Sequence, residues 1–227
     1  MRIVYLTMTS HLQPTVREGR RVVREERHQR VVCSRMGSLR RGNVRSMNSQ
    51  SFSWGSAFVD CLMTNLFART RLPIETPRLI LRLPTSGDIP DLRRSFRDKR
   101  TARAAGALLH PPEEMTDPAR MVRRTLREYR AGEHLSLSVV LRESGKCIGR
   151  VGLRGVIWNY HKVESLSFWI DPHQWNKGYA TEASWFLCRE AFQRLGVHRI
   201  GSSALDHNGA SLAVHRKLGF VREGRER

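Results

Sequence analysis

The stretch Asp171-Pro172-His173-Gln174-Trp175-Asn176-Lys177-Gly178-Tyr179-Ala180-Thr181-Glu182-Ala183 lies between an apolar run and a helical pattern, 163–170 and 180–195. A tight loop between a strand and a helix leaves several backbone N–H groups unpaired at the helix N-terminus. Those amides and the positive end of the helix dipole favour a bound anion such as a pyrophosphate. Gly178 permits positive φ and a close backbone approach, Lys177 adds a cation, and Thr181 offers a hydroxyl. The stretch therefore predicts a phosphate-binding turn.

The ligand of this turn is predicted from three motifs together. The turn has neither the Gly-x-Gly-x-x-Gly dinucleotide pattern nor a Walker loop. With two further stretches, it resembles the GNAT superfamily of acyl-CoA N-acyltransferases, in particular the branch that acetylates N-terminal alanines of ribosomal proteins. The motifs, in chain order, are Glu75-Thr76-Pro77-Arg78-Leu79-Ile80-Leu81-Arg82, then Ser167-Phe168-Trp169-Ile170 with Trp175 to Ala183, then Asn208-Gly209-Ala210-Ser211-Leu212 running to Lys217-Leu218-Gly219-Phe220.

The resemblance covers residues 72–227 and implies an α/β fold with a mixed, twisted sheet. It implies acetyl-CoA as the acyl donor, no metal, and direct attack by a primary amine without a covalent enzyme intermediate. The acceptor is then a protein N-terminus, in particular a ribosomal one, or a small amine. Members of the family continue beyond the Gly-Phe strand into another strand, so the resemblance also leads us to expect a sheet that lacks its last strand.

The resemblance assigns the acetyl-CoA contacts to one strand, the loop after it and the start of the last helix. A backbone N–H near the end of the strand would polarise the thioester carbonyl, because a fixed dipole in a partly dry cleft stabilises an oxyanion. The residues expected at the coenzyme are Phe168, Trp169, Ile170, Trp175, Asn176, Lys177, Gly178, Tyr179, Ala180, Thr181 and Asn208.

Three residues are candidates for catalysis, and each has a simpler structural alternative. Glu164 would be the general base, although relatives place this Glu where the chain has Ser165, and strand alternation turns Glu164 to the opposite face. His215 stands where many GNAT enzymes carry the Tyr that protonates the thiolate, and His donates protons near neutral pH. Its alternative is an exposed residue on a helix face. Asn208 either contacts the pantetheine arm, caps the last helix, or does both.

The chain of 227 residues has a formal net charge of +19. Residues 1–70 contain 12 arginines and four acidic residues, and their apolar periodicity is poor. We expect residues 1–70 to be a basic, disordered extension and residues 71–227 to form the N-acetyltransferase domain. The charge fits nucleic acid, the ribosome or an anionic coenzyme as a partner, or a solvated surface without a single partner.

Four cysteines at wide spacing favour free thiols in the cytoplasm over metal pairs or disulfides. No apolar run approaches the roughly 18 residues of a membrane helix, so no membrane partner is expected. The coarse element order from residue 78 onward is β-α-α-β-β-β-α-β-α-β. Strands are predicted over 78–83, 135–142, 147–158, 163–170 and 199–205, with a hairpin turn at 143–146. Helices are predicted from a cap at Asp88 to about residue 100, from a cap at Thr116 or Asp117 to Gly132, and over 180–195 and 208–218. The function predicted is N-acetyl transfer. The alternatives are a non-catalytic, CoA-binding GNAT-like module and a basic protein that binds nucleic acid or ribosomes.

Overall fold

The computed structural model describes residues 2–10, 66–101, 117–157 and 162–226. All of them belong to one compact unit, which is formed by residues 1–14 and 63–227. A second unit, residues 15–62, lies outside the described residues. The predicted disorder of most of residues 1–70 therefore stays a prediction.

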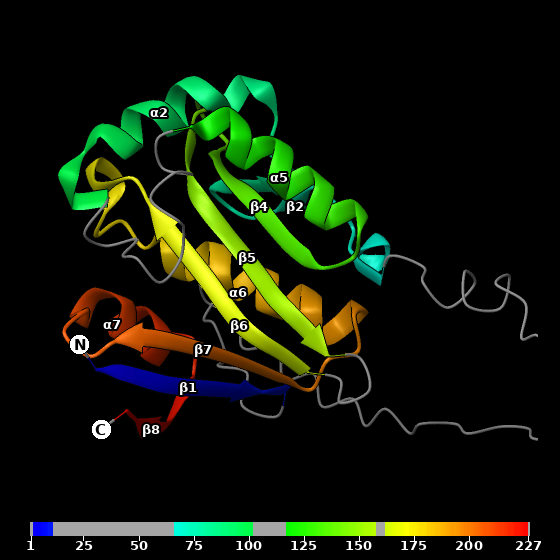
Figure 1. The fold of residues 1–227 in the computed structure, drawn as a ribbon, viewed down its shortest axis with the longest axis vertical. Coiled ribbons are helices and arrows are strands. Elements are labelled where there is room, and N and C mark those ends of the chain that lie inside the picture. Colours follow the sequence, from blue (N-terminus) through cyan, green and yellow to red (C-terminus); the bar gives the residue numbers. More distant parts are fainter. Residues whose placement is uncertain (1, 11–65, 102–116, 158–161, 227) are drawn as a thin grey trace, which may run out of the picture. The chain divides into compact units, whose positions relative to one another are not determined.

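One mixed sheet of eight strands organises this unit (Figure 1). Its strand order is β2-β3-β4-β5-β6-β7-β1-β8. Neighbouring strands are antiparallel except β6 and β7, which are parallel. The strands are β1 Ile3–Thr9, β2 Ile74–Glu75, β3 Leu79–Arg82, β4 His134–Leu141, β5 Cys147–Ile157, β6 Lys162–Ile170, β7 Arg199–Leu205 and β8 Val221–Arg225. The mixed α/β fold expected from the sequence is confirmed.

Helices cover both faces of the sheet, so that each face buries its own apolar cluster. Helices α2 (Ile89–Arg97) and α5 (Pro118–Arg130) contact one another and lie against β5 and β4. Helix α6 (Tyr179–Arg194) lies against β3, β5 and β6, and α7 (Gly209–Lys217) contacts α6. Alternation along a strand sends successive side chains to opposite faces. Accordingly Val139 belongs to the larger cluster, with α6, and Val140 to the smaller one, with α2 and α5.

Most predicted element bounds agree with the structure to within one or two residues. The hairpin over residues 143–146 is present between β4 and β5. Asp117 caps α5 by accepting a hydrogen bond from the Arg120 N–H, and Gly132 follows the helix at φ 71°. Asp88 behaves differently. Its carboxylate does not cap α2 but binds the Arg82 guanidinium at 2.6 Å and the Ser138 hydroxyl at 2.9 Å.

The first strand departs from the predicted organisation. β1 lies between β7 and β8 and is antiparallel to both, with Leu6 opposite Ser202 on one side and Arg222 on the other. Val4, Leu6 and Met8 are buried in the larger core cluster. The boundary predicted at residue 70 is therefore wrong for Ile3–Thr9. No strand follows β8 in the described residues, as expected, but the sheet gains β1 between β7 and β8.

Candidate functional site

The two parallel strands of the sheet separate and open a gap. β6 and β7 pair only at Lys162–Arg199 and Val163–Ile200, near the start of each strand. Figure 1 shows them diverging beyond this point. Across the opening, the Ser202 hydroxyl oxygen lies within hydrogen-bond distance of the Leu166 carbonyl oxygen, at 2.9 Å. Beyond Leu166 no backbone pair joins the two strands in the described part of the chain. The backbone groups on this edge of β6 are therefore not paired with β7, although β6 lies in the middle of the sheet.

The backbone orientation along β6 identifies the amides that face this gap. The N–H and C=O of one strand residue point to the same side, and the side alternates from residue to residue. The Leu166 carbonyl faces β7, so the Phe168 and Ile170 amides face the gap as well. A Cβ added at Gly149 of β5 would lie 2.2 Å from the Trp169 carbonyl oxygen, which therefore faces the other way.

Trp169, one of the residues expected at the coenzyme, is directed away from the gap. Its backbone is directed at β5, opposite Arg150, and its side chain is buried against the Phe96 ring at 5.1 Å between centroids. The backbone amides of Phe168 and Ile170 face the gap, and their contact with the coenzyme stays a prediction. The register between β5 and β6 runs without a shift from Lys162 to Ile170, so no bulge reorients this strand.

The loop after β6 leaves a row of backbone amides unpaired. Asn176 and Gly178 have φ values of 61° and 82°, and Gly178 provides no side-chain cap for α6. The first helical hydrogen bond runs from the Glu182 N–H to the Gly178 carbonyl oxygen. The backbone N–H groups from Asn176 to Thr181 have no hydrogen-bond acceptor among the described residues. These amides and the helix dipole make the turn suitable for a pyrophosphate.

Several side chains hold this loop in place. The Trp175 indole N–H donates to the Ile170 carbonyl oxygen at 2.7 Å, which ties the loop back to the end of β6. The Lys177 ammonium donates to the Gln174 amide oxygen at 2.8 Å. The Arg78 guanidinium lies 4.6 Å from the Tyr179 ring centroid and donates to the Lys177 carbonyl oxygen at 2.9 Å. The loop is therefore preorganised, while Ala180 and Thr181 begin the helix with half-buried side chains.

His215 is buried rather than exposed, with 1% of its surface accessible. Its ring lies between Phe168 and Phe220, with centroids 5.2 and 5.1 Å away. Nδ1 lies 2.8 Å from the Ser211 carbonyl oxygen, and Nε2 lies 2.7 Å from the Ser202 hydroxyl. Burial lowers the pKa of His215, although the hydrogen bond to the Ser211 backbone opposes this shift. The imidazole is therefore mostly neutral at pH 7.

The hydrogen bonds around His215 depend on one proton. The Ser211 carbonyl accepts only, so Nδ1 carries a hydrogen. The single hydrogen of Ser202 then points either to Nε2 or to the Leu166 carbonyl oxygen, which lie 2.7 and 2.9 Å away. When Nε2 is protonated, it donates to Ser202, and Ser202 donates to Leu166. The network can thus take up one proton next to the gap and release it again.

The other two candidates for catalysis do not contact His215. The Asn208 side-chain oxygen caps α7 by accepting from the Ser211 N–H at 3.0 Å. Glu164 is exposed on β6, and its carboxylate lies over Gly155, where an added Cβ would come within 2.3 Å of Oε2. Glu164 lies on the opposite face from Ser165, as strand alternation predicts.

The part of the chain that the structure describes contains no group of three or more potential metal ligands. Its two cysteines, Cys147 and Cys188, are buried free thiols, and burial raises the pKa of Cys147 to about 11. None of its helices has the length and hydropathy needed to span a bilayer. Cys33 and Cys61 lie outside the described residues.

Residues that act through contacts between distant segments are hard to predict from the sequence. Arg78 and Glu182 belong to two of the three motifs, but nothing in either motif indicates the ion pair that they form beside the loop. Ser202 gave no signal at all in the apolar strand that contains it. Arg150 interrupts the apolar run of β5, and this interruption was a usable signal of a special position.

Comparisons with known proteins agree with this geometry. The family model described as acetyltransferase (GNAT) domain matches residues 78–221. The uncharacterized N-acetyltransferase YoaA of Bacillus subtilis is 27% identical over 151 residues, which is 66% of this chain and 84% of that protein. Ribosomal-protein-S5-alanine acetyltransferase from Vibrio fischeri is a structural neighbour with a TM-score of 0.58 and 21% identity, over 68% of this chain and 85% of that one. RimJ of Mycobacterium smegmatis, solved with CoA-disulfide, has a TM-score of 0.56 and 20% identity, over 64% and 71%.

Proposed function

This chain belongs to the GNAT acetyltransferase family, and from that premise we propose that it transfers the acetyl group of acetyl-CoA to a primary amine by direct attack, either at a protein N-terminus or on a small amine. The observation that carries the proposal is the gap between β6 and β7 beside the unpaired amides of residues 176–181. The amides suit the pyrophosphate, and the gap suits the pantetheine arm and the thioester.

In this proposal the Phe168 N–H donates to the thioester carbonyl oxygen. Its strand position is fixed by the β5–β6 ladder, so the dipole needs no reorganisation when the oxyanion develops. The Ile170 N–H, two residues further along β6, points to the same side as the Phe168 N–H. Asn208 has its side-chain oxygen committed to the cap of α7, which leaves its amide N–H groups for the pantetheine arm.

Two protons must move in the reaction. Glu164, the only carboxylate on β6, takes the first from the ammonium form of the acceptor through water, so that the neutral amine attacks. As the C–N bond forms and the C–S bond breaks, the nitrogen loses a second proton and the CoA thiolate gains one. His215 accepts this proton and returns it to the sulfur through the hydroxyl of Ser202.

The preference for a protein N-terminus rests on similarity to ribosomal-protein acetyltransferases, whose fold this chain shares. A small amine would use the same chemistry. In both cases the protein would act in the cytoplasm, where acetyl-CoA and ribosomal proteins occur together.

Release of free CoA from acetyl-CoA tests the proposal. The purified full chain is incubated with a panel of Ala- and Ser-initiated peptides and small primary amines, and mass spectrometry identifies any acetylated product. Acetylated product and an equal amount of free CoA are expected. Acetyl-CoA binding without product from any amine would instead favour a non-catalytic CoA-binding module.

The alternative of a basic protein that binds nucleic acid is tested separately. It predicts binding that weakens steeply with salt and is lost with residues 1–70. The described residues offer the separated strands and the unpaired amides, which are features of a coenzyme site. Acetyl transfer is therefore the function that this geometry supports best.

A further inference from the structure

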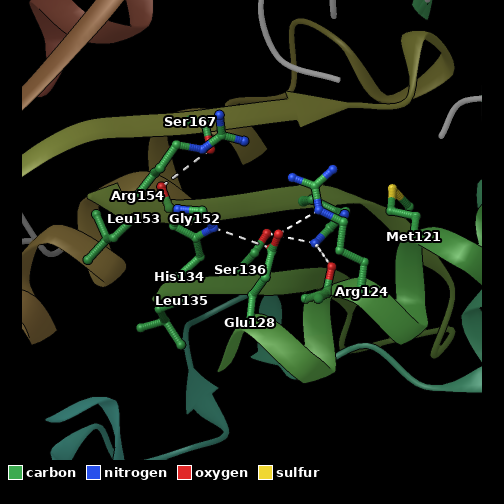
Figure 2. A pocket seen from close by; sticks show the side chains of 12 residues that line it. Met121, Arg124, Glu128, His134, Leu135, Ser136, Gly152, Leu153, Arg154 and Ser167 are labelled. Atoms are coloured by element: carbon green, nitrogen blue, oxygen red, sulfur yellow. Dashed lines mark hydrogen bonds and ion pairs between the residues drawn. The ribbon is translucent and has the colours of Figure 1, made fainter. Parts of the chain in front are cut away.

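Apart from the gap between β6 and β7, the structure has a cavity between helix α5 and strands β4, β5 and β6. It lies on the opposite face of β6 from α6. It has a volume of about 40 Å³. A single water needs about 10–15 Å³, so this space admits a few waters or a carboxylate but no coenzyme. Figure 2 shows the side chains that line it. The lining includes two arginines that the acetyl-transfer reaction does not use, Arg150 and Arg154.

Arg150 is the unusual residue of this cavity, because it is 5% exposed and has no carboxylate partner among the described residues. One of its terminal nitrogens donates to the Thr125 hydroxyl at 2.5 Å and to the Ser136 hydroxyl at 2.8 Å. Its Nε–H is buried without any hydrogen-bond acceptor. A buried guanidinium with an unused donor is costly unless a ligand completes its hydrogen bonds.

Burial lowers the pKa of Arg150 to about 10, so the side chain stays charged at neutral pH. The carboxylate in the cavity wall does not neutralise it. Glu128 binds Arg124 at 2.5 Å and lies 3.3 Å from His134, and these partners lower the pKa of Glu128. The Arg154 side chain is exposed at the cavity wall, and it has no hydrogen bond or ion pair in the described part of the chain. The cavity therefore has an excess of positive charge.

The cavity adjoins the reaction gap through a single strand. Ser167 lines the cavity, and the next residue, Phe168, directs its N–H into the gap. Gly152, between the two arginines on β5, keeps the floor open, because an added Cβ would lie 3.0 Å from the Ser136 hydroxyl oxygen. A group in the cavity is thus within reach of a short molecule whose amine lies at the gap.

We propose that this cavity binds a carboxylate of the amine acceptor, so that acceptors with an acidic group close to the amine, such as peptides with Asp after the N-terminal residue, are preferred. The Nε–H of Arg150 and the guanidinium of Arg154 are the donors to the carboxylate. The Ser167 hydroxyl, which donates a long bond of 3.5 Å to the Gly152 carbonyl oxygen, turns to the carboxylate as a neutral donor. The proposal rests on the proposed acetyl transfer, because the gap defines where the amine lies.

Binding of product peptides tests the proposal without turnover. Calorimetry compares N-acetyl-Ala-Asp-amide with N-acetyl-Ala-Asn-amide on the full chain, and the expected preference for Asp is about tenfold, as for a hydrogen-bonded charge. Arg150→Met should bring the ratio of the two affinities close to one, and Arg154→Gln, at an exposed position, should lower it. Arg222→Gln removes a charge on the exposed strand β8 and should keep the ratio.

Equal affinity of the parent protein for the two peptides, or no binding of either, overturns the proposal. A preference for Asp that survives in both Arg150→Met and Arg154→Gln overturns it as well. If Arg150→Met does not fold by circular dichroism, the exposed Arg154→Gln variant decides. Acetylation of neutral amines without an acidic preference would leave the acetyl transfer in place and reject only the carboxylate site.

Discussion

The guanidinium of Arg78 and the carboxylate of Glu182 form an ion pair of 2.6 Å across 104 residues of sequence. The same carboxylate accepts from the Arg78 backbone N–H at 3.0 Å and from the Thr76 hydroxyl at 2.6 Å. It lies in the first turn of α6, where a negative charge is favoured by the helix dipole. The ion pair thereby joins the turn before β3 to the helix that begins at the proposed pyrophosphate site.

Breaking this pair should loosen the coenzyme loop while the fold persists. Arg78→Gln removes the bond to the Lys177 carbonyl as well as the ion pair, and we expect acetyl-CoA affinity to fall by about three- to tenfold. Arg142→Gln is a matched control, because Arg142 forms an exposed ion pair of 2.5 Å with Glu75 away from the loop. Calorimetric titration with acetyl-CoA measures both variants, and equal affinities for them would contradict the role given to Arg78.

Substitution of Gly178 should weaken acetyl-CoA binding, and a negatively charged side chain at this position should weaken it more than a neutral one. An added Cβ would meet only the Arg78 guanidinium, at 3.4 Å, so the main cost of Gly178→Ala is the φ of 82°, about 1 kcal/mol. Gly178→Glu adds a negative charge beside the unpaired amides and should lower acetyl-CoA affinity far more than Gly178→Ala does. Circular dichroism is the folding control. Parental affinity in both variants would mean that the loop is only a strand-to-helix turn.

The first strand should be needed for stability, in contrast to the expectation that residues 1–70 form a disordered extension. Leu6→Ala removes a buried side chain from the core between β7 and β8 and should lower the free energy of unfolding by roughly 2–5 kcal/mol. Tyr5 is 48% exposed on the same strand, so Tyr5→Ala is the control and should cost little. Urea unfolding measures both, and similar small effects would show that β1 contributes nothing to the core.

Replacing His215 should slow turnover more than it changes binding. We expect His215→Ala to lower kcat by roughly tenfold to a hundredfold, with acetyl-CoA affinity kept. Ser202→Ala should lower kcat comparably, because Ser202 connects the imidazole to the gap. Steady-state kinetics on an acceptor found in the amine panel gives both values. Parental kcat in the two variants would return His215 to a packing role between Phe168 and Phe220.

The stability of the protein should depend on pH through His215. The pKa of this residue is lowered in the folded protein relative to its ordinary value of 6.5. Between these two values the unfolded chain binds more protons, so the free energy of unfolding falls as the pH drops below about 6.5. Above pH 6.5 both states are neutral at this position and the contribution is constant. Thermal unfolding across this range should show a weaker slope for His215→Phe, and an unchanged slope would contradict the shifted pKa.

Much of the fold was determined by local patterns in the sequence. The alternation of apolar and basic residues over 78–83 predicted β3, and the turn at 143–146 predicted the hairpin of β4 and β5. Positive φ at Gly178 and at Asn176 follows from the side chains themselves, because these residue types tolerate the left-handed region. A residue's own conformational preference and its immediate neighbours suffice for such features.

Only the tertiary structure decided which distant segments meet. Residues 3–9 are apolar enough for a strand, but their partners, Arg199–Leu205 and Val221–Arg225, lie about two hundred residues away. From the sequence His215 was either a proton donor or an exposed residue on a helix face, and its burial depends on Phe168, Phe220 and Ser202. Arg150 lacks a carboxylate because of what α5 and β4 place around it. Burial, pKa and pairing are properties of several segments together, and they therefore required the packed structure.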